Sequence, residues 1–306
     1  MRRFLLAFFV TAIMTLSACG KTDRITVIVP YGSPMLALVG LIEDDERYDV
    51  DVVMGADALV AAFASGTHDV IVAPTQLGAR FHRGQEDHAL LATVVWGNLS
   101  VCSIDTPLDT FSSLDGKSLT VFGENQVPDI IIRALVEDME LDVDLDYVDS
   151  LSTAVALLSH DPGLVILAAE PSLSMLKANH PALHIVDVQD AFQEMTGRHS
   201  FPQSSVFVRP DMSNDTLTLL LDDIMRSVRD ASDDPASYAI RAARAGMTMD
   251  AQDIESAIPG SNLRVVLSSE AKDDVDYLLD LIMGVNPDLL GGVKPPETFY
   301  LSGIET

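Results

Sequence analysis

The chain is poor in positive charge. It has 19 lysines and arginines against 46 aspartates and glutamates, which gives a formal net charge of −27 at pH 7. A field of this sign repels polyanions, so we expect no nucleic-acid partner, and an anionic small ligand would need a local cationic pocket. A solvated acidic surface that keeps the chain soluble explains the composition as well, so the charge alone does not name a ligand.

The sequence also lacks the motifs of common catalytic and metal sites. It contains no G-x-S-x-G and no H-E-x-x-H. Gly116-Lys117-Ser118 resembles the end of a phosphate-binding loop, but Phe111 stands where the first glycine is needed, and a strand rather than a helix follows. His82 and His88 have no obvious third ligand. We therefore expect no catalytic residue, no metal site and no cofactor.

The only candidate membrane segment is short and lies at the N-terminus. Met1-Arg2-Arg3 is basic, and the apolar stretch Phe4–Leu16 has the length of a secretory signal, whereas a bilayer takes roughly 20 apolar residues. Leu16-Ser17-Ala18-Cys19-Gly20 resembles the lipobox of bacterial lipoproteins, whose cysteine receives a diacylglycerol. A plain secretory signal and an uncleaved anchor helix are the alternatives. We predict a lipoprotein signal peptide over residues 1–19 and an exported protein anchored to the bacterial cell membrane through Cys19.

Cysteine is scarce, and this limits how the mature chain can be stabilised. If Cys19 carries a lipid, Cys102 is the only thiol left, and no intrachain disulfide can form. Cys102 lies in an apolar run, where a small core residue is the simplest interpretation. An exported protein of this kind depends on its hydrophobic core alone.

The apolar pattern predicts an α/β protein of two lobes. Short apolar runs alternate with helix-like stretches, which is typical of a mainly parallel sheet flanked by helices. The apolar passage Ala89–Ile104 is too long for one strand and is interrupted at Trp96-Gly97-Asn98, so we expect it to cross to a second lobe. Gln203–Arg209 resembles a return crossing. The predicted organisation is lobe 1 over residues 24–97, lobe 2 over 98–203, and a return to lobe 1 with C-terminal helices over 204–306.

Several short stretches resemble, in order, the landmarks of a known family. They are Val72-Ala73-Pro74-Thr75, Val95-Trp96-Gly97-Asn98-Leu99, Leu114-Asp115-Gly116-Lys117, Gly123-Glu124-Asn125, Ala169-Glu170-Pro171, Phe201-Pro202-Gln203 and Leu290-Gly291-Gly292. Together they resemble the type II periplasmic binding proteins of ABC importers, in the SsuA-like group of nitrate, sulfonate, taurine and thiamine-precursor binders. The resemblance implies two lobes joined by two crossing strands, a monomer, a small organic ligand held between the lobes, and an ABC permease as partner.

One feature departs from the oxyanion-binding members of that group. Those members are expected to surround the ligand with donors or cations, yet the candidate loops here carry Glu124, Asp129 and Glu170, with Arg133 as the nearest obvious cation. We therefore expect a neutral or cationic ligand.

Residues that follow the strands of both lobes are the predicted ligand contacts. Ligands bind beyond the carboxyl ends of the strands in an open α/β sheet. The predicted contacts are Tyr31, Gly32, Ser33, Pro34, Gly55, Thr75, Gln76, Trp96, Asn98, Glu124, Asn125 and Glu170. Alternatives stand beside four of them, since Trp96 could be a core residue at the hinge, Thr75 a helix N-cap, and Glu124 and Glu170 favourable charges at the start of a helix.

Two other functions are compatible with the same sequence. An exported enzyme could use the same fold, and a ligand-sensing subunit could present the same pocket to a membrane receptor. Neither alternative requires a different arrangement of the lobes.

The lipobox makes a direct prediction about the mature protein. Mass spectrometry of protein from native membranes should find Cys19 as the first residue, modified with diacylglycerol. An unmodified Cys19 in that material would contradict the lipid anchor.

Overall fold

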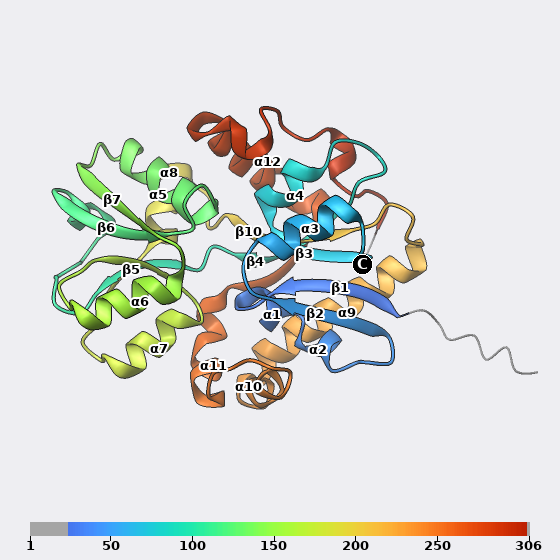
Figure 1. Ribbon diagram of the computed structural model, residues 1–306, viewed down its shortest axis with the longest axis horizontal. Coiled ribbons are helices and arrows are strands. Elements are labelled where there is room, and N and C mark those ends of the chain that lie inside the picture. Colours follow the sequence, from blue (N-terminus) through green and yellow to red (C-terminus); the bar gives the residue numbers. More distant parts are fainter. Residues whose placement is uncertain (1–23, 305–306) are drawn as a thin grey trace, which may run out of the picture.

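The computed structural model describes residues 24–304, so the predicted signal peptide and the lipid attachment site at Cys19 lie outside the described residues. Two sheets, each with its own helices, lie side by side (Figure 1). Among the described residues, no helix combines the length and the apolar character that a membrane crossing needs.

The first sheet has six strands in the order β11-β4-β10-β3-β1-β2. β1 runs parallel to β2 and β3, whereas β10 is antiparallel to both β3 and β4, and β11 is antiparallel to β4. The mixture arises because the chain leaves this sheet along β4 and returns along β10 in the opposite direction. The strands are β1 (Ile25–Pro30), β2 (Tyr48–Val53), β3 (Val70–Pro74), β4 (Ala89–Trp96), β10 (Pro202–Val208) and β11 (Leu263–Leu267).

The second sheet has five strands in the order β7-β6-β8-β5-β9. β6 is parallel to β7 and β8, while β5 is antiparallel to β8 and β9. Each sheet thus has a parallel part, as the βα alternation predicts, and an antiparallel part. The strands are β5 (Leu99–Ser103), β6 (Lys117–Phe122), β7 (Val143–Val148), β8 (Ile166–Ala169) and β9 (His184–Asp187).

We use lobe 1 for the six-stranded sheet with its helices and lobe 2 for the five-stranded sheet with its helices. The helices of lobe 1 are α1 (Ser33–Ala37), α2 (Val39–Ile42), α3 (Asp57–Ser65), α4 (Thr75–Phe81), α9 (Asn214–Asp233), α10 (Pro235–Arg244), α11 (Ala251–Ala257) and α12 (Ser268–Val285). Those of lobe 2 are α5 (Val127–Asp138), α6 (Leu151–His160), α7 (Ser172–Asn179) and α8 (Val188–Thr196). Short 3₁₀ turns occupy Phe111–Leu114, Pro259–Ser261, Pro287–Leu290 and Glu297–Phe299.

Helices cover both faces of the first sheet, and this explains its apolar strands. Along β3, Val70 and Val72 pack into one hydrophobic cluster, whereas Ile71 and Ala73 pack into another. Successive side chains of a strand point to opposite faces, so a strand that is buried on both faces is apolar along its whole length. The second cluster continues into lobe 2, where it includes Val101, so one core extends through both lobes.

The long apolar passage crosses between the lobes as predicted. It forms β4 in the first sheet and β5 in the second, with Gly97 and Asn98 between them. The return crossing precedes β10 (Figure 1), so the prediction that Gln203–Arg209 is the crossing is wrong: nearly all of that segment is a strand paired with β3 and β4 in the first sheet. The sequence pattern did not single out β11, because it is a short strand inside a region that otherwise reads as helices.

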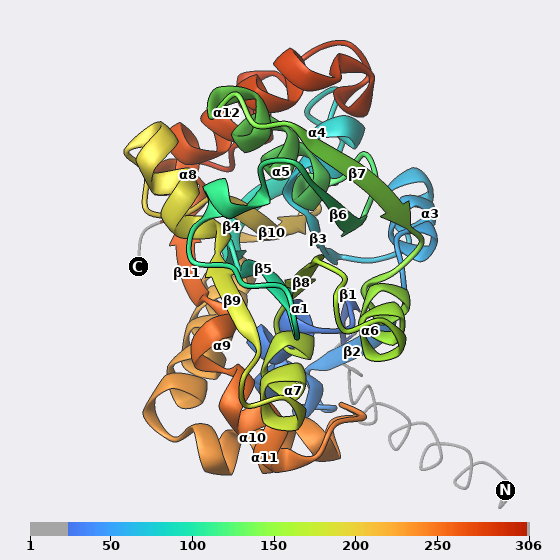
Figure 2. The same ribbon diagram turned by 90° about the vertical axis from the view of Figure 1, so that its left-hand side faces the viewer.

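The lobes also contact each other on both sides of these crossings. α12 packs against α5, and α11 packs against α7. In the view from lobe 2, α12 lies at the top and α11 at the bottom (Figure 2). The strand ends of the two sheets that face each other therefore lie between the contact of α12 with α5 and the contact of α11 with α7.

The packing of α4 on β10 predicts the effect of one glycine substitution. A Cβ atom at Gly78 would overlap the ring of Phe207, which is fully buried. Because the ring packs against Phe63 and Phe299, any shift of it disturbs the core, and Gly78→Ala should lower the free energy of unfolding by about 1–3 kcal/mol, as overpacking of cores does. Urea denaturation measures this change.

Gly284→Ala in α12 is the matched control, because no heavy atom lies within 4 Å of the added Cβ. It should leave the stability unchanged or raise it slightly. Equal losses for the two variants would show that steric contact with Phe207 is not the cause.

Candidate functional site

Ser33 joins the two lobes at the carboxyl end of β1. Its side chain is 3% exposed, and its Oγ donates a hydrogen bond to the carbonyl oxygen of Glu170 at 3.1 Å. The same Oγ accepts a hydrogen bond from Nδ2 of Asn98 at 3.0 Å. Residues predicted from three separate parts of the sequence are thus brought together: Ser33 from lobe 1, Asn98 from the outward crossing and Glu170 from lobe 2. We call these three residues the Ser33 group.

Asn98 lies at the start of the second sheet and is almost fully enclosed. Its backbone N–H donates to Oε1 of Gln203 at 3.4 Å, and its carbonyl oxygen accepts from the N–H of Glu170 at 3.3 Å. Its side chain is 4% exposed, and its Oδ1 has no hydrogen-bond partner among residues 24–304. Asn98 therefore holds the crossing in place and retains one free acceptor.

Thr75 and Gln76 begin α4 directly after β3. Thr75 is fully buried, and its hydroxyl lies 2.9 Å from Oγ of Ser205 on β10, which also lies 3.0 Å from Oγ1 of Thr93. The N-cap position belongs to Pro74, and Thr75 makes no capping hydrogen bond, so the N-cap interpretation of Thr75 is wrong. Gln76 is 6% exposed, and its Oε1 has no partner within the described chain.

Glu170 supplies a carboxyl group at the carboxyl end of β8. Its two oxygens accept hydrogen bonds from the backbone N–H and the hydroxyl of Ser174, at 3.0 and 2.9 Å. Burial raises the pKa of Glu170, and the hydrogen bonds from Ser174 oppose that shift. Across the lobe boundary, a Cβ atom at Gly260 would lie 2.7 Å from Oε1 of Glu170, so glycine permits the close approach.

Trp96 is a core residue of the hinge in this structure. It is 1% exposed, and its Nε1 donates to the carbonyl oxygen of Arg264 at 3.1 Å. The Arg264 guanidinium lies 4.3 Å from the centroid of the indole ring. This position fits the core alternative better than a ligand contact.

Other predicted residues lie around the same strand ends with different partners. The Tyr31 hydroxyl accepts from the N–H of Thr248 at 3.1 Å. Asn125 has a positive φ of 57°, and its Oδ1 accepts from Nδ2 of Asn286 at 3.2 Å, whereas Glu124 is exposed.

Three further predicted residues are backbone features rather than polar groups. Gly32 occupies the N-cap position of α1 with a φ of 108°, which favours glycine. Pro34 follows in the first turn of that helix. Gly55 lies exposed after β2, and a Cβ atom added there would have no heavy atom within 4 Å, so Gly55 makes no close contact with the Ser33 group.

The sequence pattern missed Asn262 and the turn that carries it. Its Nδ2 donates to the carbonyl oxygen of Gly97 at 2.9 Å, and its own carbonyl oxygen accepts from the N–H of Trp96 at 3.1 Å. Asn262 has a positive φ of 48°. The run Pro259-Gly260-Ser261-Asn262 is a turn signal that could have marked this segment, although not its partner at the hinge.

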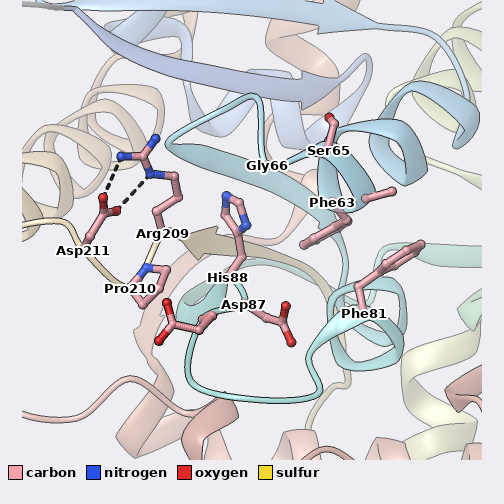
Figure 3. Close-up of a pocket in the computed structure, with 11 residues that line it drawn as sticks. Phe63, Ser65, Gly66, Phe81, Asp87, His88, Arg209, Pro210 and Asp211 are labelled. Atoms are coloured by element: carbon pink, nitrogen blue, oxygen red, sulfur yellow. Dashed lines mark hydrogen bonds and ion pairs between the residues drawn. The ribbon is translucent and has the colours of Figure 1, made fainter.

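A separate hollow of about 400 Å³ lies at the opposite end of β3 and β10 (Figure 3). Two of its polar side chains have partners in the chain. The Arg209 guanidinium makes two hydrogen bonds of 2.9 Å to Asp211, and a ring nitrogen of His88 lies 2.8 Å from the carbonyl oxygen of His68. Burial lowers the pKa of His88. None of the predicted contacts lines this hollow.

Comparisons with known proteins identify the fold. No protein-family model and no curated protein matches the sequence. Among solved structures, an ABC transporter from Parabacteroides distasonis is 23% identical, with a TM-score of 0.78 over 91% of this chain and 99% of that one. The aliphatic sulphonate binding protein SsuA from Escherichia coli is 11% identical, with a TM-score of 0.67 over 93% and 96%.

A third similar structure contains a bound ligand. The alkanesulfonate-binding protein SsuA from Xanthomonas axonopodis, bound to MOPS, is 14% identical, with a TM-score of 0.65 over 90% of this chain and 96% of that one. The chain therefore has the periplasmic binding protein fold, which confirms the predicted fold class. Its structural neighbours include the sulfonate binders that the sequence landmarks resemble.

The buried carboxyl group of Glu170 predicts a pH-dependent stability. Because its pKa is raised in the folded state, the fold favours the protonated form, and ionisation destabilises it as the pH rises from the ordinary value of 4.5 through the raised one. Glu170→Gln should therefore be more stable than the parent at pH 7. The difference should shrink as the pH falls below the ordinary value.

Urea denaturation between pH 4 and pH 8 measures this difference. Glu124→Gln removes the same charge at an exposed position and is the control for general charge repulsion. A parent protein that is more stable than Glu170→Gln at pH 7 would contradict the argument from burial.

Proposed function

We propose that this protein is an extracytoplasmic solute-binding protein that captures a small organic molecule between its lobes and delivers it to an ABC importer. It acts as a monomer, attached to the cell membrane through a lipid on Cys19. The ligand is neutral or cationic. The similar solved structures described above are transport proteins, which supports ligand capture rather than catalysis.

The observation that carries the proposal is the Ser33 group. Ser33 follows a strand of lobe 1, Glu170 follows a strand of lobe 2, and Asn98 lies on the crossing between them, yet all three are linked by hydrogen bonds. Loops at strand ends carry ligand contacts in α/β proteins. The Ser33 group joins both lobes at these strand ends, so it is positioned to contact a ligand held between the lobes.

Closure of the lobes is the mechanism that this arrangement supports. A ligand that contacts both lobes binds the closed form more tightly than the open form, so it shifts the population towards closure. The polar contacts of Ser33 with Asn98 and Glu170 are neutral hydrogen bonds, each of which contributes only about 1 kcal/mol, whereas the ion pair of Arg198 with Asp274 lies on the α12 side. A ligand of modest affinity is therefore sufficient to move the equilibrium.

The charges near the group support a neutral or cationic ligand. Glu124 and Glu170 are acidic, and the predicted contacts include no lysine or arginine. Arg133, the nearest obvious cation in the sequence, lies with its Nη2 3.1 Å from a carboxylate oxygen of Asp129. A sulfonate or nitrate ion would therefore compete with Asp129 for that guanidinium.

Ligand binding should raise the melting temperature and compact the protein. Screening the purified protein against a metabolite library by thermal shift identifies binders, because a compound that binds only the folded state stabilises it. X-ray scattering with and without each binder should show a smaller radius of gyration with it. If no compound raised the melting temperature and the scattering curves stayed identical, the proposal would lose its support.

A further inference from the structure

Two buried side-chain oxygen atoms of predicted ligand contacts, Oε1 of Gln76 and Oδ1 of Asn98, have no hydrogen-bond partner among the described residues. Among residues 24–304, enclosed side-chain polar atoms without partners occur on only three residues: Gln76, Asn98 and Arg133. Arg133 is ion-paired with Asp129 in lobe 2. The other two are predicted ligand contacts, Gln76 at the end of a strand and Asn98 on the crossing between the lobes, and both are less than a tenth exposed.

The hydrogen bonds of Asn98 show which of its atoms is free. The single hydroxyl hydrogen of Ser33 goes to the carbonyl oxygen of Glu170, so Ser33 accepts from Asn98. The amide nitrogen of Asn98 therefore faces Ser33, and its Oδ1 is the atom left without a partner. A buried acceptor without a hydrogen-bond partner lowers the free energy of unfolding, and a ligand that donates a hydrogen bond to it removes this cost.

The free oxygens of Gln76 and Asn98 belong to segments on either side of β10. Pro74, which precedes α4, pairs with Ser204 of β10, while Trp96 pairs with Pro202. β3 and β4 are separated by one intervening strand, which places them roughly 10 Å apart. A small organic molecule is long enough to reach both segments.

We infer that the ligand presents at least two hydrogen-bond donors, one to Oε1 of Gln76 and one to Oδ1 of Asn98. This inference rests on the proposed function and deepens it by naming the ligand class. Amines, amidines and amides carry the necessary N–H groups. Simple sulfonates and nitrate carry only acceptor oxygens, which would repel Oδ1 of Asn98, because Ser33 holds the Asn98 amide in this orientation. Such an ion could be accepted at Gln76 only if its amide turned to present Nε2.

The identity of the ligand tests the inference first. Protein purified gently from its native cells is analysed by native mass spectrometry, and the released compound is transferred to D₂O to count its exchangeable hydrogens. We expect at least two. Benzamidine, benzenesulfonate and N,N,N-trimethylanilinium are added as probes of similar shape, and we expect binding of benzamidine but not of the other two, which lack N–H groups.

A variant of Gln76 tests the role of its oxygen directly. Gln76→Met keeps the length of the side chain and removes the buried acceptor. We expect a higher melting temperature without ligand, because no unpaired oxygen is buried, and at least tenfold weaker binding of the released compound or of benzamidine. Gln85→Met makes the same change at an exposed position and should alter neither property.

The outcomes separate this inference from the proposed function. A bound ligand without exchangeable hydrogens, or unchanged affinity in Gln76→Met, overturns the inference and leaves ligand capture intact. Unchanged affinity with a higher melting temperature would mean that the oxygen of Gln76 is buried without a partner and does not contact the ligand. If the native cells, the metabolite library and the three probes all provide no binder, the proposed function fails and the inference fails with it.

Discussion

The close packing around Gly97 fixes how the two lobes face each other. A Cβ atom at this position would lie 2.7 Å from the ring of Phe201 and 2.9 Å from Oε1 of Gln189. The backbone N–H of Gly97 donates to the carbonyl oxygen of Phe201 at 2.9 Å, so the outward and returning segments touch at this point. A residue with a side chain would push them apart, and the facing strand ends of the two sheets would separate with them.

The residue after this glycine belongs to the candidate site, so the hinge and the site share the same backbone. Asn98 contacts Ser33 with its side chain and Glu170 with its carbonyl oxygen. On the α12 side, by contrast, the contact between the lobes combines aromatic packing, with Phe192 and Tyr277 edge to face at 6.1 Å, and the ion pair of Arg198 with Asp274. Apolar packing is lost when lobes separate, whereas water replaces neutral hydrogen bonds at little cost. We therefore expect the α12 side to remain in contact and the Ser33 side to open.

Periodicity was sufficient to predict most strands and the outward crossing, because a strand buried on both faces or a passage too long for one strand leaves a visible pattern, but it missed β11 and placed the return crossing on β10. The expectation that ligands bind beyond strand ends likewise selected Ser33, Gln76 and Glu170 without any knowledge of their partners, and the interruption of the crossing passage pointed to Asn98. The partners themselves could not be predicted. Thr75 looks like a helix cap until β10 places Ser205, 130 residues away in sequence, beside its hydroxyl. Which atoms of Gln76 and Asn98 remain unpaired depends on that same long-range packing.

Net charge and local hydrogen bonding act on the ligand at different ranges. The negative field of the whole chain raises the local concentration of cations and speeds their encounter, but salt screens it beyond about 8–10 Å. Selection among the compounds that arrive depends on short-range terms, and a site with unpaired acceptors rejects a ligand that lacks donors because the acceptors then remain buried and unpaired. The oxygens of Gln76 and Asn98 therefore constrain the ligand more narrowly than the net charge of −27 does. The negative field of the chain would attract a cation without N–H groups, but such a cation would leave the oxygens of Gln76 and Asn98 unpaired and would bind weakly.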